Sequence, residues 1–315
     1  MPTRNHSSKT ASWRAWLAVP FLALCSIAAQ AAPLTIGYSD WPGWVAWQVA
    51  IEKGWFKEAG VDVKFEWFDY SASMEAFAAG KLDAVTMTNG DALVTGSGGG
   101  KSVMLMLTDY SNGNDVLVAK APVKSIKDLK GKKVSVEAGL VEHLLLLNAL
   151  KKNGMKESDV TIVNAKTNEM PQVFAAGDVS VVGAWQPIVN EALKAVPGSH
   201  KLYTSADEPG LIYDVVAASP TSASKRRAEW IKVLKVWDRV VKYINDPKTQ
   251  PDAVKIMAAR SGVSAAEYLP LLKGTFLLDL AAGQKTYAKG TGFSSLYGST
   301  KIVDDFNDEK PVPFA

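Results

Sequence analysis

The sequence predicts an α/β protein of two lobes with a helical C-terminal region. Short apolar strands alternate with helical stretches, one segment recurs in two stretches of the chain, and helices dominate after Ala217. A chain of 315 residues, 47% of them hydrophobic, is long enough for about two folded domains.

The alternation starts after Pro33 and follows the rhythm of β-α-β units. In the first stretch we expect strands at 34–38, 61–67, 84–87 and 102–108, with helices at 42–52, 73–79 and 91–96 between them. In the second stretch we expect strands at 133–136, 160–163 and 179–184, with helices at 141–152 and 170–176. A long helix over 222–244 carries apolar residues on one face and is expected to pack on the first lobe.

An internal repeat supports two lobes of one topology. Residues 77–85, Phe-Ala-Ala-Gly-Lys-Leu-Asp-Ala-Val, recur as residues 174–182, Phe-Ala-Ala-Gly-Asp-Val-Ser-Val-Val. Both copies read as a helix end, a glycine cap and a buried strand. The alternative is a chance likeness between two helix-glycine-strand junctions, since the match is short.

The first 31 residues have the pattern of a secretory signal peptide. A basic start is followed by an apolar run over 16–29 and by Ala29-Gln30-Ala31, a small-x-small cleavage pattern. The apolar run is shorter than the ~20 residues of a membrane anchor. We therefore expect the mature protein in the periplasm. The alternative, a lipoprotein with Cys25 as the lipid-bearing residue, is disfavoured by the bulky Leu24 before it.

The charge balance excludes some classes of partner. Lys and Arg number 35 and Asp and Glu 32, but three basic residues and no acid lie within the first 31 residues. The remaining chain has 32 of each sign, so no basic surface for nucleic acid is expected. Cys25 is the single cysteine, which excludes a thiolate metal cluster, and we expect neither a metal nor a cofactor.

Three motifs in order give a family resemblance. These are Lys-Gly-Trp-Phe-Lys-Glu-Ala-Gly-Val-Asp-Val at 53–63, Ala-Gly-Lys-Leu-Asp-Ala-Val at 79–85 and Ile-Lys-Asp-Leu-Lys-Gly-Lys-Lys-Val at 126–134. Over residues 33–250 the chain resembles the periplasmic substrate-binding proteins of the nitrate, sulfonate and taurine type of ABC importer. The resemblance implies a two-lobed type II periplasmic-binding-protein fold, each lobe a mixed sheet flanked by helices, with the ligand in the cleft. It also implies a partnership with an inner-membrane permease and its ATPase, and we expect a monomer.

On this interpretation lobe 1 comprises residues 33–115 and 215–315, and lobe 2 comprises residues 116–214. The chain is expected to cross between lobes near Asp115–Lys120 and again near Tyr213–Ala217.

Candidate ligand residues follow the strands, because ligands of open α/β sheets bind beyond the carboxyl ends of the strands. The candidates are acidic, aromatic or polar: Asp40, Trp41, Trp44, Thr88, Asn89, Asp91, Tyr110, Glu137, Trp185 and Asp214. Trp185 occupies the position in the second copy of the repeat that Thr88 occupies in the first. Some candidates have a structural alternative: Asp40 as the cap of a helix starting at Pro42, and Glu137 as a partner of a helix dipole.

The acidic character of these positions predicts the charge of the ligand. Sites for anions usually offer hydroxyls and free backbone amides at a helix start, whereas the turn at 137–142 has Glu137 and Glu142 and no hydroxyl. We expect a small cationic or amide-like nitrogen compound such as guanidine, urea or a small amine, bound by carboxylates and stacked on tryptophan. A fainter resemblance to urea-type importers points the same way. We expect Glu142 to be a solvated helix residue, and Asp69 and Tyr70 to lie in a loop.

Three alternatives stay open. The protein could bind an anion instead, namely an alkanesulfonate, taurine or nitrate. A ligand-sensing module would have the same cleft, and an enzyme related to the thiamine-pyrimidine precursor synthase shares the fold, although the leader argues against an intracellular enzyme. Beyond the leader the histidines are His143 and His200 alone, which supports no catalytic triad, so we expect a binding protein and no enzyme.

Overall fold

The computed structural model describes residues 1–3 and 32–287. The predicted signal peptide lies outside the described residues except at its extreme start. The body of the protein is a compact unit that begins at Pro33 and contains two sheets. Within the described part, no helix has both the length and the apolar content needed to cross a membrane.

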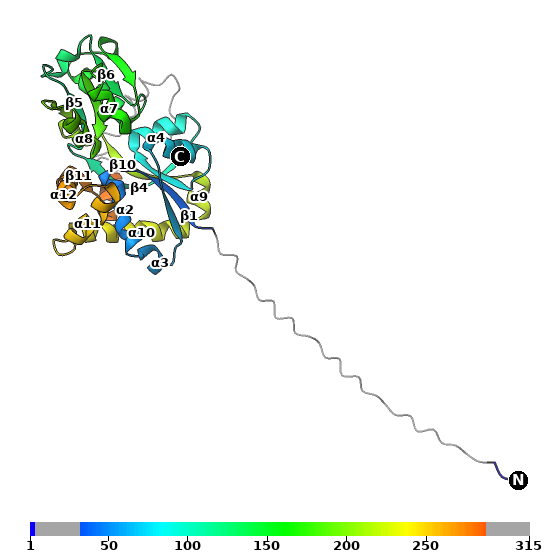
Figure 1. The fold of residues 1–315 in the computed structure, drawn as a ribbon. Helices are drawn as coiled ribbons and strands as arrows, with labels where there is room; N and C mark the ends of the chain where they lie inside the picture. The colour runs from blue at the N-terminus through cyan, green and yellow to red at the C-terminus, as the bar shows by residue number, and fades with distance from the viewer. Residues whose placement is uncertain (4–31, 288–315) are drawn as a thin grey trace. The chain divides into compact units, whose positions relative to one another are not determined.

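A six-stranded mixed sheet organises the first lobe (Figure 1). Its strands are β1 (Leu34–Tyr38), β2 (Val63–Trp67), β3 (Ala84–Thr88), β4 (Val103–Ser111), β10 (Tyr213–Ala218) and β11 (Thr275–Leu277), in the order β11-β4-β10-β3-β1-β2. β1 is parallel to β2 and β3, and β10 is antiparallel to β3 and β4. The strands β3 and β10 lie at the centre of the sheet, and every residue of both is buried.

Helices cover both faces of this sheet. The first-stretch helices are α1 (Pro42–Val45), α2 (Trp47–Glu52), α3 (Trp55–Glu58), α4 (Tyr70–Ala78) and α5 (Asn89–Ser97). The C-terminal helices are α9 (Pro220–Lys225), α10 (Arg227–Asn245), α11 (Gln250–Ser261), α12 (Ala265–Lys273) and α13 (Leu280–Tyr287). The predicted helix at 222–244 corresponds to α9 and α10, which meet at Arg226. It packs on the first lobe as expected, since the rings of Trp47 and Trp237 lie 4.6 Å apart in the buried core.

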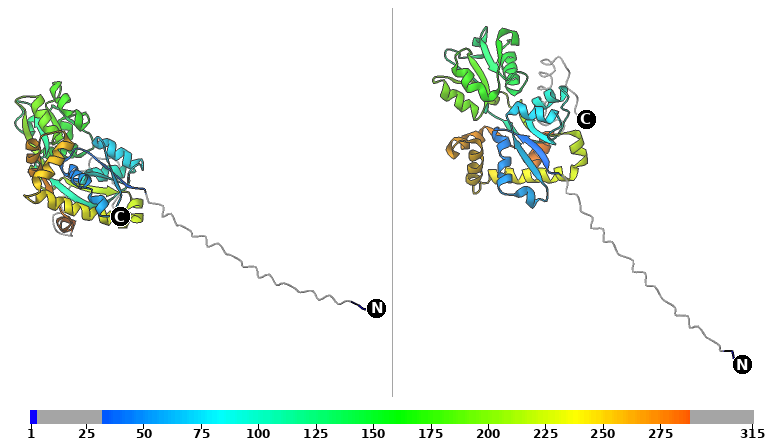
Figure 2. Two further views of the ribbon diagram at one scale, coloured as in Figure 1. Left: turned by 60° about the horizontal axis from the view of Figure 1, so that its bottom comes forward. Right: turned by 45° about the vertical axis from the view of Figure 1, so that its right-hand side comes forward.

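A five-stranded mixed sheet organises the second lobe, drawn in green in Figures 1 and 2. Its strands are β5 (Asp115–Ala119), β6 (Lys133–Val136), β7 (Thr161–Asn164), β8 (Val181–Trp185) and β9 (His200–Thr204), in the order β7-β6-β8-β5-β9. Its helices are α6 (Val141–Lys152), α7 (Met170–Ala175) and α8 (Ile188–Ala195), with a short 3₁₀ turn η3 (Thr167–Glu169) before α7. The two-lobed mixed α/β fold predicted from the sequence is confirmed.

The repeat in the sequence reflects equivalent positions in the two sheets. The order β2-β1-β3-β10-β4 in the first sheet matches β7-β6-β8-β5-β9 in the second. In each sheet the first three strands are parallel and the fourth is antiparallel to its neighbour. The repeated segment spans the end of α4 and the start of β3 in one lobe, and the end of α7 and the start of β8 in the other. The match is therefore not a chance likeness.

The chain crosses between the sheets slightly earlier than the sequence suggested. The segments expected to cross, Asp115–Lys120 and Tyr213–Ala217, instead form strands β5 and β10, because their apolar residues are buried inside a sheet. The crossings are the residues just before them, 112–114 and 205–212. The hydroxyls of Ser111 and Ser205 lie 2.7 Å apart where the crossings meet, so the two connections support each other.

Candidate functional site

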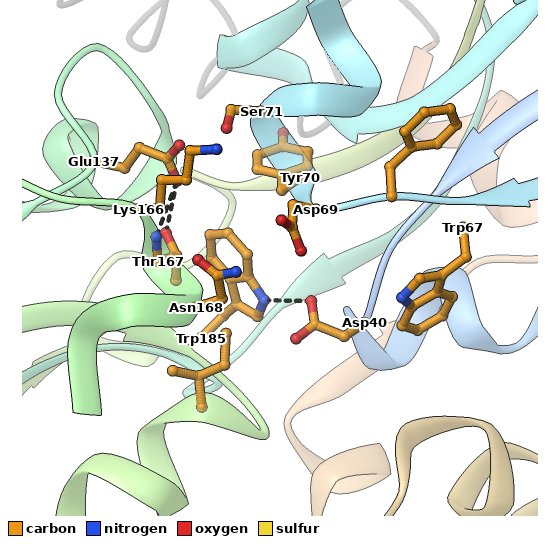
Figure 3. Close-up of a pocket in the computed structure, with 12 residues that line it drawn as sticks. Asp40, Trp67, Asp69, Tyr70, Ser71, Glu137, Lys166, Thr167, Asn168 and Trp185 are labelled. Carbon is orange, nitrogen blue, oxygen red and sulfur yellow. Dashed lines mark hydrogen bonds between the residues drawn. The ribbon is translucent and has the colours of Figure 1, made fainter. Parts of the chain in front are cut away.

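The ends of β1, β3, β6 and β8 and the starts of β5 and β10 meet between the two sheets. Two cavities lie there, and they are called the outer and the inner chamber below. The outer chamber has a volume of about 70 Å³ and is lined by Asp40, Trp67, Phe68, Asp69, Tyr70, Ser71, Glu137, Lys166, Thr167, Asn168, Trp185 and Ile188 (Figure 3). The inner chamber has about 10 Å³ and is lined by Trp41, Trp44, Tyr70, Thr88, Asp115, Val141, Trp185, Ile212 and Asp214. Seven of the ten predicted ligand residues line one chamber or both.

Asp40 and Trp185 form a direct bond between the lobes across the outer chamber. Trp185 ends β8 and donates from Nε1 to Oδ1 of Asp40, which follows β1, at 3.0 Å (Figure 3). Burial raises the pKa of Asp40 to about 6, although the indole hydrogen bond acts in the opposite direction. Asp40 does not cap α1 with its side chain, since Trp41 is the residue at the N-cap position.

Glu137 forms the opposite wall of the outer chamber. It follows β6, and its Oε2 accepts hydrogen bonds from the backbone N–H and the hydroxyl of Thr167, at 3.1 and 3.0 Å (Figure 3). The same turn carries the exposed side chain of Lys166. The charged lining of the outer chamber is thus Asp40, Asp69 and Glu137 against one lysine.

Four aromatic rings enclose the inner chamber. Trp41 and Trp44 come from the turn into α1, Tyr70 begins α4, and Trp185 enters from the second lobe. The ring of Tyr70 lies 5.0 Å from that of Trp44 and 5.3 Å, edge to face, from that of Trp185. Each of the four side chains is less than 5% exposed, so water has little access to the chamber.

Two pairs of buried acids stand beside the inner chamber. Asp214 starts β10 directly opposite Asp109 of β4 in the sheet, and Asp115 starts β5 next to Glu142 of α6. Burial, followed by the charge of the partner acid, raises the pKa of Asp214 and of Glu142 well above the ordinary range. Burial also raises the pKa of Asp109 to about 6 and that of Asp115 to about 7.

These four acids have no cationic partner in the described part of the chain. No Lys, Arg or His forms an ion pair with any of them there. The Oδ2 atoms of Asp109, Asp115 and Asp214 are buried without a hydrogen-bond partner, as are both carboxylate oxygens of Glu142. Buried charges are normally balanced by an opposite charge. Within each pair the two carboxyl groups can share a proton, which lowers the charge of the pair, but no cation in the described residues balances what remains. No group of three or more His, Cys, Asp and Glu side chains among residues 32–287 is arranged to hold a metal ion.

The remaining predicted residues support the walls of the site. Thr88 lines the inner chamber and also caps α5, because its hydroxyl accepts from the backbone N–H of Asp91 at 3.1 Å. Asp91 accepts a hydrogen bond from the Tyr70 hydroxyl at 2.6 Å and so holds that ring in place. Asn89 accepts from the backbone N–H of Tyr213 at 3.0 Å. Neither Asn89 nor Asp91 lines a chamber.

Tyr110 lies further from the chambers than the sequence suggested. Its ring is stacked on Phe276 of β11, with the centroids 4.8 Å apart and the planes at 8°. It lines neither chamber, because residues on a strand point alternately to opposite faces, and the preceding Asp109 takes the inward position.

Several residues of the site were missed or misjudged from the sequence, Asp69, Lys166 and Thr167 of the outer chamber among them. Glu142 was expected to be solvated, but it is fully buried, because most of α6 is buried between its own sheet and the first lobe. Tyr70 was expected in a loop and instead begins α4. Asp115 was assigned to a crossing segment; the one signal for it was its place at the head of an apolar run, which is where the polar ends of strands meet.

Comparisons with known proteins agree with this architecture. The "Putative binding protein BAB2_1146" of Brucella abortus is 31% identical over 193 residues, which are 61% of this chain and 59% of the relative. The chain thus matches less than two thirds of that relative's length. The taurine-binding periplasmic protein of Escherichia coli is 28% identical over 82% of both chains.

A solved structure shows the same fold. The alkanesulfonate-binding protein SsuA of Xanthomonas axonopodis pv. citri, bound to MOPS, superposes with a TM-score of 0.72 at 19% identity, covering 88% of this chain and 96% of SsuA. The family described as NMT1/THI5 like matches residues 41–250, two thirds of the chain, and this range contains every residue that lines the two chambers except Asp40. The chain belongs to the NMT1/THI5-like family.

Proposed function

We propose that this protein is a periplasmic solute-binding protein of an ABC importer, and that its ligand is a small cationic or amide-like nitrogen compound such as guanidine, urea or a small amine. One observation carries the ligand class: the chambers are lined and backed by acids that have no cationic partner in the described part of the chain.

A cation would relieve an electrostatic cost that the empty site bears. Each buried carboxylate must either hold a proton or remain charged in a medium that solvates it poorly. A ligand with N–H groups offers donors to the unpartnered oxygens of Asp115 and Asp214, and charge-assisted hydrogen bonds are the strong ones. The rings of Trp41, Trp44 and Trp185 add cation–π attraction where water is excluded.

Ligand binding is coupled to closure of the two lobes. The ligand enters while the lobes are apart, and the bond from Trp185 to Asp40 forms only when they meet, because the two residues come from different sheets. Binding therefore favours the closed form, which an inner-membrane permease and its ATPase recognise. No covalent step is required, and we propose no enzymatic activity.

An anionic ligand is the second candidate, and a specific residue favours it. Lys166 lines the outer chamber beside the hydroxyl of Thr167, and the relative from Escherichia coli is named for binding taurine, which carries a sulfonate. Against it, an anion in that chamber would face Asp40, Asp69 and Glu137, each repelling it by about 1 kcal/mol or more at 4 Å.

Ligand-induced stabilisation separates these candidates. The mature protein is unfolded, refolded to remove carried-over ligand and melted with guanidinium, urea, methylammonium, taurine or nitrate at matched ionic strength. A ligand that binds only the native state raises stability by RT ln(1 + [L]/Kd). We expect a rise in Tm with a cation or urea.

Two variants test whether this rise in Tm depends on an acid of the outer chamber. Glu137→Gln should reduce the rise with guanidinium or urea, which are too large for the inner chamber, whereas Glu75→Gln, an equal loss of charge on the exposed side of α4, should leave it unchanged. A rise with taurine or nitrate and none with any cation or urea would contradict the proposal and support the anion.

A further inference from the structure

We propose that the ligand is a linear diammonium compound, with one ammonium group between Asp115 and Asp214 in the inner chamber and the other between Asp40 and Glu137 in the outer chamber. This inference rests on the proposed cation-binding function and narrows it from a class of nitrogen compounds to one with two positive ends and an apolar middle.

The inner chamber fits one ammonium group. Its volume of about 10 Å³ is roughly that of a single water position, and an ammonium group is similar in size to water. A guanidinium or a trimethylammonium group is larger and would require the rings of Trp41, Trp44 and Trp185 to move apart. The size of this chamber therefore selects a primary amine as the buried end of the ligand.

The acceptors that an ammonium group needs are already in the inner chamber. Asp115 and Asp214 are 2% and 1% exposed, both line the chamber, and the Oδ2 atom of each lacks a hydrogen-bond partner. An ammonium group has three N–H donors and no acceptor, so it can serve both oxygens at once. Asp109 and Glu142 lie directly behind these two acids, so a positive charge in the chamber is close to all four carboxyl groups.

The two chambers share an aromatic wall. Tyr70 and Trp185 line both, and their rings meet edge to face at 5.3 Å. Such a wall suits methylene groups, which gain by leaving water and need no hydrogen-bond partner. A chain of methylenes along these two rings would connect a head group in one chamber to a head group in the other.

The outer chamber is acidic as well, and two of its carboxylates each have an oxygen available to accept a hydrogen bond from a ligand. Trp185 binds Oδ1 of Asp40 and Thr167 binds Oε2 of Glu137, which leaves one oxygen on each carboxylate for a ligand. Its volume of about 70 Å³ is several times that of the inner chamber, so it can admit a hydrated ammonium end. Carboxylates at both ends of an aromatic passage match a dication, whereas a single cation would leave one end uncompensated.

Calorimetric titration of the refolded full-length mature chain tests the inference. The probes are the α,ω-diamines from ethylenediamine to cadaverine, each paired with the monoamine of the same carbon chain, together with guanidinium and taurine. We expect one diamine to bind roughly 10- to 100-fold more tightly than its monoamine, which is the expected gain from one additional charged hydrogen-bonding group.

Variants assign each ammonium group to its chamber. Glu137→Gln should weaken the diamine and leave the monoamine unchanged, because the monoamine uses only the inner chamber. Asp214→Asn should weaken both, and the exposed Glu75→Gln should weaken neither. Native-like melting of each variant establishes that the losses are local.

Other outcomes separate this inference from the proposed function. Equal affinity for diamines and monoamines, or tighter binding of guanidinium than of any diamine, would overturn the diammonium inference and leave cation binding standing. Binding of taurine with no binding of any amine or guanidinium would overturn both.

Discussion

Replacing Asp91 by Asn should stabilise the ligand-free protein at neutral and alkaline pH. Asp91 is buried, and its desolvation raises its pKa from 3.8 to about 7, against the opposing effect of the hydrogen bond from Tyr70. An Asn side chain retains an oxygen that can accept this hydrogen bond and carries no charge. The variant therefore removes the cost of a buried charge without removing the contact that holds Tyr70.

The size and the sign of the effect follow from the two pKa values. Below pH 4 the native and unfolded states both hold the Asp91 proton, and the charge costs nothing. Between pH 4 and 7 the unfolded chain releases this proton while the native state keeps it, so stability falls as pH rises and levels off above pH 7. At 1.36 kcal/mol for each pK unit the full cost is roughly 4 kcal/mol, of which roughly 3 kcal/mol falls between pH 5 and 8.

Thermal unfolding of the refolded protein at pH 5 and at pH 8 measures this effect without urea or guanidinium, both of which are candidate ligands. We expect the advantage of Asp91→Asn over the wild type to grow by roughly 3 kcal/mol between the two pH values. Glu75→Gln, an exposed acid on α4, serves as the control and should show no growth. An advantage that does not change with pH would refute the assignment of Asp91 as a buried, destabilising acid.

Three further predictions concern the closed site. Trp185→Phe keeps a ring but loses the donor to Asp40, so calorimetry should show ligand affinity reduced roughly 10- to 100-fold, and an unchanged affinity would exclude this bond from closure. Affinity for a cation should fall as pH drops below about 6, where Asp40 gains a proton, and titrations of Asp40→Asn should show a weaker dependence. Gly43→Ala should cost about 1–3 kcal/mol by thermal melting, because its Cβ would overlap the Asp109 carboxylate, whereas Gly96→Ala has open space and should be neutral or stabilising.

The sequence was informative at three positions that end or follow a strand. Asp40, Glu137 and Trp185 were predicted to face the cleft because strand ends converge in an open α/β sheet, and all three line the outer chamber. The internal repeat predicts that Trp185 and Thr88 occupy equivalent positions, and the two residues do end equivalent strands, β8 and β3.

The sequence was uninformative where burial depends on the other lobe. Glu142 lies on a helix that is apolar on nearly every side, so no solvent-facing stripe marks its environment. Asp115 and Glu142 are adjacent only because β5 and α6 pack together, and they are buried partly by residues more than fifty positions away. Asn89 looked like a ligand residue because of its chemistry, yet its side chain fixes β10 by binding the backbone of Tyr213.

Trp185 and Thr88 end equivalent strands of the two lobes but have different roles in the site. Two copies of one topology end their third strands differently: one with a small hydroxyl that stays within its own lobe, the other with an indole that reaches across to Asp40. Each lobe contributes one of the two acids that line the inner chamber, Asp214 from the first and Asp115 from the second. The two lobes thus share the acids that attract a cation, but only one supplies the closing indole, so a change at Trp185 can alter the rate of ligand release without altering the charge of the site.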